Sequence, residues 1–253
     1  PFVGGGAVLI DILQKYDVKS AYAFDINLDL INCYNIIKAN VEELIKELKE
    51  KEDNYLKLEE ENRQKYFYEI RKEYNSYQIS TEELRIKRAS EFIFLNRTCF
   101  NGLIRYNKKG EFNVPVGKVD LSNSIYKNLK AFVEGIKTKD IHFSNLDFRN
   151  PELYSKEESF YYFDPPYLIT TAPYNNHWSV ETEKELLSLL DRLNFENKKF
   201  ALSNVILSNG KENLLLKEWS KKYNIVFLNR QYRNANYQKK NITDTIEVLI
   251  KNY

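Results

Sequence analysis

The spacing of apolar residues changes several times along the chain. An apolar run at residues 21–25 indicates a short buried strand that ends in an acid. Residues 51–77 are charged, almost free of glycine and proline, and carry an apolar stripe at helical spacing. After residue 140, short apolar runs alternate with helical patterns again. The pattern therefore predicts an α/β part, a mostly helical part and a second α/β part.

The second α/β part contains a regular alternation. Its expected strands lie at residues 160–163, 200–204, 225–228 and 245–250, and its expected helices at 181–193 and 212–221. Alternation of this kind implies a mainly parallel sheet with helices on both faces, with ligands at the carboxyl ends of the strands. We therefore expect a Rossmann-like α/β fold.

The helical part is expected to be an insertion. Residues 1–50 and 140–253 would form the catalytic domain, and residues 51–139 a mostly helical subdomain with a β-hairpin. Within the insertion, Ser80 and Glu83 predict a capping box at the start of a helix that runs through Leu95.

The stretch Asp164-Pro165-Pro166-Tyr167 follows the apolar run 160–163 directly. Two prolines remove two backbone donors, so the carbonyls around them stay free to accept hydrogen bonds, and Asp164 adds an anionic acceptor. Such a turn can hold an NH2 group by acceptors alone and aim its lone pair at an electrophile, while Tyr167 offers a face to a purine. An ordinary X-Pro-Pro turn at a strand end has the same sequence, so the context must support an amine-methylating site.

That context is a glycine-rich turn near the N-terminus. Gly4, Gly5 and Gly6 follow Phe2-Val3 and precede a helical pattern, so the backbone can approach a ligand closely. Asp25 lies about 20 residues further on, at the spacing at which such folds bind a ribose. The glycines do not match the dinucleotide or P-loop patterns. A nucleoside-bearing cofactor without a phosphate cradle is therefore favoured over NAD or ATP.

Composition limits the possibilities further. The net charge of +2 over 253 residues requires any nucleic-acid surface to be a local patch. Cys33 and Cys99 lack CxxC spacing, and His142 and His177 stand alone, so neither a disulfide nor a metal site is expected. No signal peptide or long apolar span is present, which favours a cytoplasmic protein with no membrane part. The chain begins at Pro1 and has no methionine, so we expect the natural protein to start further upstream.

Taken together, these motifs resemble the Dam-like DNA adenine-N6 methyltransferases, including type II and type IIS modification methylases. The resemblance implies that S-adenosylmethionine is the cofactor and that residues 164–167 hold the target adenine. The segment 143–148 resembles a strand-end acid near the cofactor adenine. Cofactor contacts are thereby implied for Phe2, Gly4, Gly5, Gly6, Asp25, Asp147 and Asp164.

The longest match is residues 95–115, which are similar to the family's DNA-reading hairpin. The sequence Asn107-Lys108-Lys109-Gly110 predicts its four-residue turn, and lysines at a hairpin tip suit phosphate contact. The resemblance places Phe100 as a wedge in the duplex, Asn101 beside the vacated base and Arg105 on a guanine. It also implies contact of Leu103 and Pro115 with a thymine methyl.

The resemblance implies site-specific methylation at N6 of an adenine flipped from double-stranded DNA at a GA-containing site, with GATC as first expectation. Residues 234–240 look more like type IIS methylases, whose sites are asymmetric. The basic stretch 229–241 is expected to be a loop, either on the DNA backbone or merely solvated, and 168–180 a loop that closes over substrate. A partner from a restriction-modification system, fused or separate, fits this class.

Three alternatives remain open at this point. A catalytically silent DNA-binding module would keep the hairpin without binding cofactor. A methyltransferase acting on RNA or on a protein glutamine could use a similar Pro-Pro-Tyr turn. An interaction protein without a ligand gives no reason for acids and a glycine turn at strand ends.

Overall fold

The computed structural model describes residues 1–118, 121–170, 178–228 and 245–253. They form two compact units. The N-terminal unit comprises Val3–Asn145, and the C-terminal unit comprises Leu146–Tyr253 together with Pro1–Phe2. The boundary expected at residue 50 falls inside a helix of the N-terminal unit, α3 (Val41–Leu56). The functional division into a catalytic domain and an inserted subdomain stays a prediction.

The N-terminal unit contains a pair of parallel strands. β1 (Ser20–Asp25) pairs with β2 (Asp140–Asn145) in a register that sets Ser20 beside Asp140. α1 (Ala7–Lys15) precedes β1, and α2 (Leu28–Ala39) follows it. Tyr34 of α2 stacks on Phe143 of β2 at 4.7 Å between ring centroids, within a small core of apolar residues. Each strand therefore ends at the same edge of this pair.

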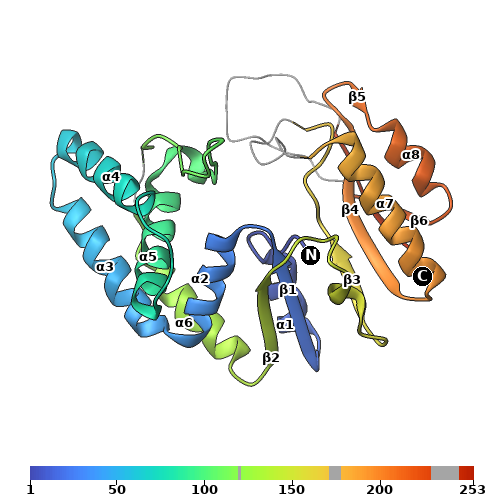
Figure 1. Ribbon diagram of the computed structural model, residues 1–253, viewed down its shortest axis with the longest axis horizontal. Helices are drawn as coiled ribbons and strands as arrows, with labels where there is room; N and C mark the ends of the chain where they lie inside the picture. The colour runs from blue at the N-terminus through green and yellow to red at the C-terminus, as the bar shows by residue number, and fades with distance from the viewer. Residues whose placement is uncertain (119–120, 171–177, 229–244) are drawn as a thin grey trace. The chain divides into compact units, whose positions relative to one another are not determined.

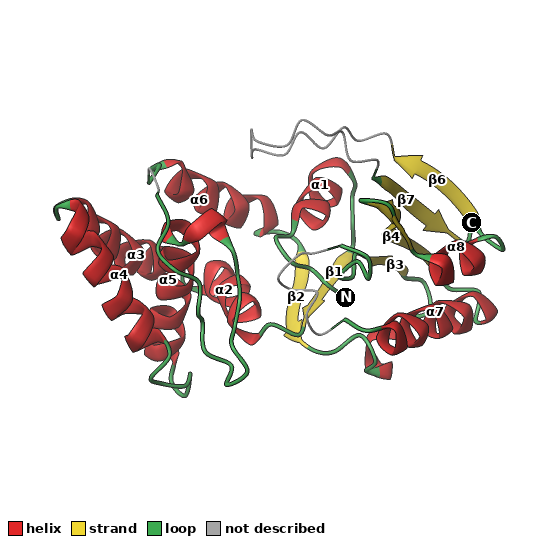
Figure 2. Ribbon diagram, turned by 90° about the horizontal axis from the view of Figure 1, so that it is seen from above, coloured by secondary structure: helices red, strands yellow, loops and turns green. Residues whose placement is uncertain are grey.

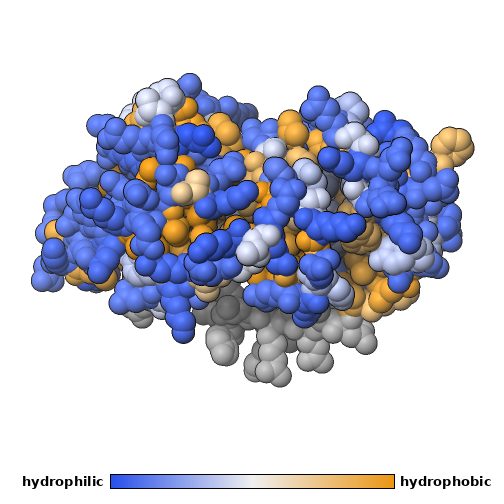
Figure 3. All heavy atoms as spheres, turned by 90° about the horizontal axis from the view of Figure 1, so that it is seen from below, coloured by the Kyte–Doolittle hydropathy of each residue, from blue (hydrophilic) through white to orange (hydrophobic). Residues whose placement is uncertain are grey.

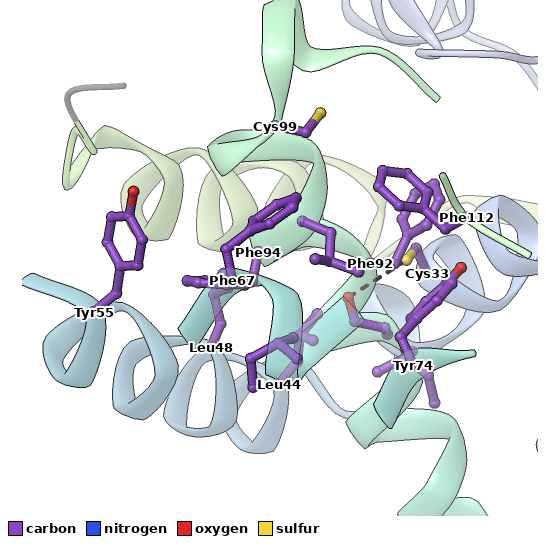
Figure 4. Packing of buried hydrophobic residues seen from close by; sticks show 14 of the residues in the cluster. Cys33, Leu44, Leu48, Tyr55, Phe67, Tyr74, Phe92, Phe94, Cys99 and Phe112 are labelled. Carbon is purple, nitrogen blue, oxygen red and sulfur yellow. Dashed lines mark hydrogen bonds between the residues drawn. The ribbon is translucent and has the colours of Figure 1, made fainter. Parts of the chain in front are cut away.

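The rest of the N-terminal unit is helical. α3 is followed by α4 (Glu60–Tyr74), α5 (Glu82–Thr98), the short 3₁₀ helix η1 (Phe100–Gly102) and α6 (Ser124–Ile136). α3, α4 and α5 lie side by side (Figures 1 and 2). Their facing sides bury one core, in which Leu44, Leu48, Phe67, Tyr74 and Phe94 are 0% exposed (Figure 4). Of the apolar stripe expected along residues 51–77, Phe67, Ile70 and Tyr74 are buried on α4, whereas Tyr77 lies beyond that helix and is half-buried. The segment is divided between two helices.

The helix cap expected at Ser80 is wrong by one residue. α5 is capped by Thr81, whose hydroxyl accepts from the backbone N–H of Leu84 at 3.2 Å. Ser80 and Thr81 offer the same chemistry, so the local sequence could not choose between them.

The C-terminal unit is built on a larger sheet in the strand order β3-β4-β7-β6. β3 (Phe160–Phe163) is parallel to β4 (Lys199–Ser208), and β7 (Ile246–Lys251) is antiparallel both to β4 and to β6 (Asn224–Leu228). β3, β4 and β6 therefore share one direction. β4 is buried along almost its whole length. The expected α/β class and mainly parallel sheet are confirmed.

Two helices pack beside this sheet, α7 (Val180–Phe195) and α8 (Leu214–Ser220) (Figure 2). A helix was expected from residue 212, but Lys211–Glu212 form a short strand, β5, paired with the end of β4. The turn between them is Asn209-Gly210, with φ of 51° and 75°, which is typical of a tight hairpin. A single-turn 3₁₀ helix, η2 (Pro151–Tyr154), precedes β3.

Hydrophilic side chains cover most of the face shown in Figure 3. Within the described ranges, no helix is long and apolar enough to cross a membrane. Cys33 and Cys99 are buried free thiols, and burial raises the pKa of each.

Candidate functional site

Asp25 fixes the glycine turn of the N-terminal unit. Its Oδ2 accepts from the backbone N–H of Gly4 at 3.0 Å, and its Oδ1 accepts from that of Asn27 at 2.9 Å. The backbone N–H of Val3 donates to the carbonyl of Phe24 at 2.9 Å, so the chain before the turn lies beside the end of β1. A carboxylate offers about four lone-pair positions, so Asp25 can hold this turn and still accept from hydroxyl groups of a ligand.

Tyr34 packs against the glycine turn through its hydroxyl group. Its hydroxyl donates to the carbonyl of Gly4 at 2.9 Å, and a Cβ atom on Gly6 would lie 2.5 Å from that hydroxyl. Gly6 also has φ of +71°, so this position requires glycine on two grounds. Burial, and after it the charge of Asp25, raise the pKa of Tyr34 to about 12. The Tyr34 phenol is therefore a neutral donor at physiological pH.

Phe2 belongs to an aromatic cluster of the C-terminal unit. Its ring lies 5.4 Å from that of Phe148 and 5.7 Å, edge-on, from that of Trp178. Trp178 in turn donates through its indole N–H to Glu183 at 2.6 Å. Trp178 was not singled out in the sequence, because it follows a polar stretch with no apolar periodicity to mark it.

Glu183 is a buried carboxylate at the start of α7. Besides Trp178, it accepts from the side-chain amides of Asn204 at 3.3 Å and Asn213 at 3.2 Å. Burial raises its pKa, and these three donors oppose that effect. The network ties α7 to β4 and to the cap of α8, so Glu183 has a structural role.

Asp147 lies two residues beyond the end of β2 and is held by Arg149. The backbone N–H of Arg149 donates to Oδ1 of Asp147 at 2.9 Å, and its guanidinium lies 2.9 Å from Oδ2. The same guanidinium donates to Glu185 at 2.6 Å. The structure thus gives Asp147 a fixed orientation, while its expected role beside a cofactor stays a prediction.

The Asp164–Tyr167 turn begins where β3 ends. Phe163 and Pro165 are buried, whereas Asp164 is exposed. The hydroxyl of Tyr167 donates to Oδ1 of Asp164 at 2.7 Å and lies 3.2 Å from Oγ of Ser203 on the neighbouring β4. Burial, and then the charge of Asp164, raise the pKa of Tyr167 well above its usual value. Tyr167 therefore remains a neutral phenol, and the strand pairing of β3 with β4 determines where it holds Asp164.

The expected hairpin is present in the N-terminal unit. Tyr106 and Phe112 form an antiparallel bridge, and Asn107 and Glu111 are joined by a backbone hydrogen bond of 2.9 Å. The side-chain oxygen of Asn107 accepts from the backbone N–H groups of Lys109 and Glu111 at 2.9 and 3.0 Å, and Gly110 has φ of +77°. The predicted four-residue turn is confirmed. Lys108 and Lys109 are exposed at its tip.

Phe100 and Pro115 lie together at the base of the hairpin. The backbone N–H of Phe100 donates to the carbonyl of Pro115 at 2.9 Å, and both side chains are exposed. Phe100 keeps 51% of its surface in solvent, so its ring is accessible to a binding partner. Asn101 is exposed and has a left-handed backbone, with φ of 55°. Leu103 is half-buried against the helical core, so only part of its side chain faces solvent.

Arg105 is oriented by Asn113 across the hairpin. Its Nε donates to the side-chain oxygen of Asn113 at 2.8 Å, and its Nη2 to the backbone carbonyl of the same residue at 3.0 Å. A guanidinium carries five donors in a planar fork, so this pair of bonds occupies one edge. The edge formed by Nη1 and Nη2 keeps the geometry of a bidentate contact to guanine O6 and N7.

Two expected loops lie largely outside the described residues. They are the substrate-closing loop 168–180, of which residues 171–177 are not described, and the basic stretch 229–241 with the segment 234–240 inside it.

The chain is similar to known DNA-modifying enzymes. Residues 1–234 match the model of the D12 class N6 adenine-specific DNA methyltransferases. Type II methyltransferase M.MjaIII of Methanocaldococcus jannaschii is 38% identical over 251 residues, which cover 94% of this chain and 78% of the relative. Type II methyltransferase M.FokI of Planomicrobium okeanokoites is 34% identical across 100% of this chain, which spans only 38% of that relative. DNA adenine methylase of Serratia marcescens is 35% identical, over 78% of this chain and 70% of the relative.

Proposed function

Because this chain belongs to the D12 class N6 adenine-specific DNA methyltransferases, we propose that it transfers a methyl group from S-adenosylmethionine to N6 of an adenine flipped out of duplex DNA. The observation that carries the proposal is the turn at the end of β3. There, the exposed carboxylate of Asp164 accepts a hydrogen bond from the neutral phenol of Tyr167, and two prolines lie between these residues.

The residues of the turn suit an amine substrate. Asp164 and the carbonyl of Pro165 would accept hydrogen bonds from the two N–H bonds of the adenine amine. These acceptors draw the nitrogen lone pair away from the ring and orient it, without prior removal of a proton. Tyr167 would stack on the purine, and its hydroxyl bond to Asp164 fixes both groups together. Formation of the new N–C bond would break the S–CH3 bond of the sulfonium, with S-adenosylhomocysteine leaving with that electron pair. The amine nitrogen would then be cationic, and its proton would pass to Asp164 or water.

The glycine turn suits a nucleoside-bearing cofactor. S-adenosylmethionine supplies an electrophilic methyl group when bound. Asp25 would accept from its ribose hydroxyls. The open space beside Gly4 and Gly5 leaves room for the cofactor, and Gly6 is proposed as a further contact through its backbone. Phe2, Asp147 and Asp164 are proposed as further contacts, with Phe2 supplying an aromatic face that its packing on Phe148 holds in place.

The hairpin suits a DNA groove. Flipping a base costs a few kcal/mol, which an inserted aromatic side chain can offset by replacing the lost stacking. Phe100 is proposed as that wedge, with Asn101 beside the vacated position and Arg105 on a guanine. Lys108 and Lys109 would contact phosphates, and Leu103 and Pro115 a thymine methyl. Residues 51–139, which include the hairpin, are proposed as the target-recognition part.

The proposed target is a GA-containing site, with GATC first. An asymmetric site of the type IIS kind is the alternative, suggested by the sequence of residues 234–240. A restriction-modification partner, fused or separate, is proposed with either target.

Methyl transfer from labelled S-adenosylmethionine to unmethylated genomic DNA tests the proposal. Modification-sensitive sequencing should then find N6-methyladenine at one motif. Parallel reactions with RNA and with protein substrates separate the rival methyltransferases, and calorimetry with S-adenosylhomocysteine separates a silent DNA-binding module. Methylation of cytosine, RNA or protein in place of adenine would overturn the proposal.

A further inference from the structure

Asp29, in the first turn of α2, is a buried acid with partners from three other segments of the N-terminal unit. It is 8% exposed. Its Oδ2 accepts from the hydroxyls of Tyr74 at 2.5 Å and Tyr106 at 2.9 Å, and its Oδ1 accepts from Nε of Arg88 at 2.8 Å. One carboxylate therefore joins α2 to α4, α5 and the hairpin.

Arg88 and Tyr74, which both donate to Asp29, also contact each other. The guanidinium of Arg88 lies 3.6 Å from the ring centre of Tyr74 and also donates to the main-chain carbonyl of that residue. A buried charge that loses a hydrogen-bonding partner destabilises the fold strongly. The cluster therefore favours an arrangement in which all of its members remain hydrogen-bonded. A displacement of Asp29 would therefore be passed on to the residues that donate to it.

The same N-terminal end of α2 is also tied to the glycine turn. Asn27 caps α2 through its side-chain oxygen, which accepts from the backbone N–H of Leu30 at 3.1 Å. The backbone N–H of Asn27 donates to Asp25, which also holds Gly4. The acid proposed to bind the cofactor ribose thus also sets the first turn of α2, where Asp29 lies.

The two strands of the hairpin are anchored differently. The returning strand is held on α4, where the amide of Asn75 makes both a donor and an acceptor bond to the backbone of Phe112, and Arg71 donates to the carbonyl of Val114 at 3.0 Å. Tyr106 ties the outgoing strand to α2 through Asp29. Arg105 is the residue immediately before it.

We propose that Tyr106 is a positioning residue that couples occupancy of the cofactor site at Asp25 to base reading by Arg105. The proposal rests on the proposed function, because it takes Asp25 and Arg105 in the roles given above. Cofactor contacts at Asp25 stabilise one placement of the start of α2, and the Asp29–Tyr106 bond transmits that placement to the outgoing strand. By thermodynamic reciprocity, bound cognate DNA tightens cofactor binding by the same factor.

Tyr106→Phe tests this coupling while keeping the ring that packs edge-on against Phe112. DNA affinity is measured by anisotropy on a cognate duplex and on a duplex changed at the guanine, with and without saturating S-adenosylhomocysteine. In the unaltered protein, we expect saturating S-adenosylhomocysteine to raise the affinity for the cognate duplex about fivefold or more. The coupling ratio is the affinity for the cognate duplex with S-adenosylhomocysteine divided by the affinity without it. In Tyr106→Phe this ratio should fall towards one, while the affinity for S-adenosylhomocysteine, measured by calorimetry, should be unchanged.

Tyr77→Phe is the matched control. It removes a phenol–carboxylate bond of 2.7 Å, to Glu91, in the same unit but outside the hairpin. It should keep the full coupling ratio, and thermal melting should show that both variants remain folded at the temperature of the binding measurements. A coupling ratio retained in Tyr106→Phe, lost equally in Tyr77→Phe, or absent from the unaltered protein would overturn the inference. Failure of the unaltered protein to bind S-adenosylhomocysteine would overturn the proposed function instead.

Discussion

The hydroxyl of Tyr167 and the carboxylate of Asp164 form a 2.7 Å hydrogen bond across the two prolines between them. The bond turns one oxygen of Asp164 towards its own turn and fixes the plane of the carboxylate. The reach of Tyr167 is limited in turn by Ser203 on β4, at 3.2 Å. The orientation of the proposed amine acceptor is therefore set by the sheet as well as by the turn.

Asp164→Ala should remove the acceptor while leaving the hairpin intact. We expect methyl transfer to fall by about 100-fold or more, the usual effect of losing a preorganised hydrogen-bond partner of the reacting group. DNA affinity should change little. Single-turnover methyl transfer and anisotropy measure the two effects, and strong residual turnover would contradict the role given to Asp164.

Tyr167→Phe should have a smaller effect, because it keeps the stacking ring and removes only the hydroxyl, with its hydrogen bond to Asp164 and its contact with Ser203. A hydrogen bond of this kind contributes about 1 kcal/mol, so the rate should fall about three- to tenfold. Single-turnover kinetics with saturating DNA separate this loss from weaker binding. A loss as large as that of Asp164→Ala would show that the hydroxyl itself contacts the reacting amine.

Gly6→Ala should destabilise the N-terminal unit, since its Cβ would meet Tyr34 and its φ of +71° disfavours any side chain. We expect a cost of at least about 1–2 kcal/mol in the free energy of unfolding from the left-handed backbone alone. Gly5→Ala is the control, because a Cβ there meets nothing within 4 Å. Urea denaturation of both variants checks the difference, and equal stability would refute the close approach at Gly6.

Arg105→Ala and Lys109→Ala should separate base reading from phosphate contact. Loss of Arg105 should cost about 1–3 kcal/mol on cognate DNA and relax preference at one position. Loss of Lys109 should weaken binding on every DNA sequence. It should also reduce the steepness of the plot of log affinity against log salt concentration by about one unit. Anisotropy titrations at several salt concentrations measure both. A uniform loss in Arg105→Ala would assign Arg105 to the backbone instead.

Alkaline pH should destabilise the fold through Tyr34. Its pKa is about 12 in the folded chain and lies at 10.0 without burial. Between these values the unfolded chain has lost the proton and the folded chain keeps it, so stability that is present below about pH 10 is lost as pH rises towards 12. Urea titrations should show that Tyr34→Phe lowers the slope of stability against pH in this window by up to about 1.4 kcal/mol per unit. An unchanged slope would show that groups other than Tyr34 account for the pH dependence of stability in this window.

Local sequence predicted those elements whose signals are short and strong. β3 matches the expected strand, because an aromatic run ends there at two prolines. The hairpin turn was predictable from Asn107 and Gly110, whose side chain and backbone freedom it uses. β5 was missed although Asn209-Gly210, an ordinary hairpin signal, precedes it directly.

Long-range partners could not be predicted in this way. Asp29 looks like a surface acid at the start of a helix. Its burial is made possible by donors that are distant in the sequence: Arg88, Tyr74 and Tyr106, which are 59, 45 and 77 residues away. The bond between Arg105 and Asn113 depends equally on the fold of the hairpin. The roles proposed for the glycine turn and for the hairpin came from the resemblance of motifs, because a local pattern does not record which distant residues lie close together.

The position of β7 in the sheet has a consequence for the order of folding during synthesis. β6 comes before β7 in the chain, yet in the described sheet it pairs only with β7, which lies between β6 and β4. While the ribosome has released β6 but not residues 246–251, β4 has an uncovered edge and β6 has no partner in its final register. Unpaired edges of this kind invite pairing with other chains. Residues 246–251 therefore close the sheet, and a nascent chain that stalls before them would depend on chaperones to stay unaggregated.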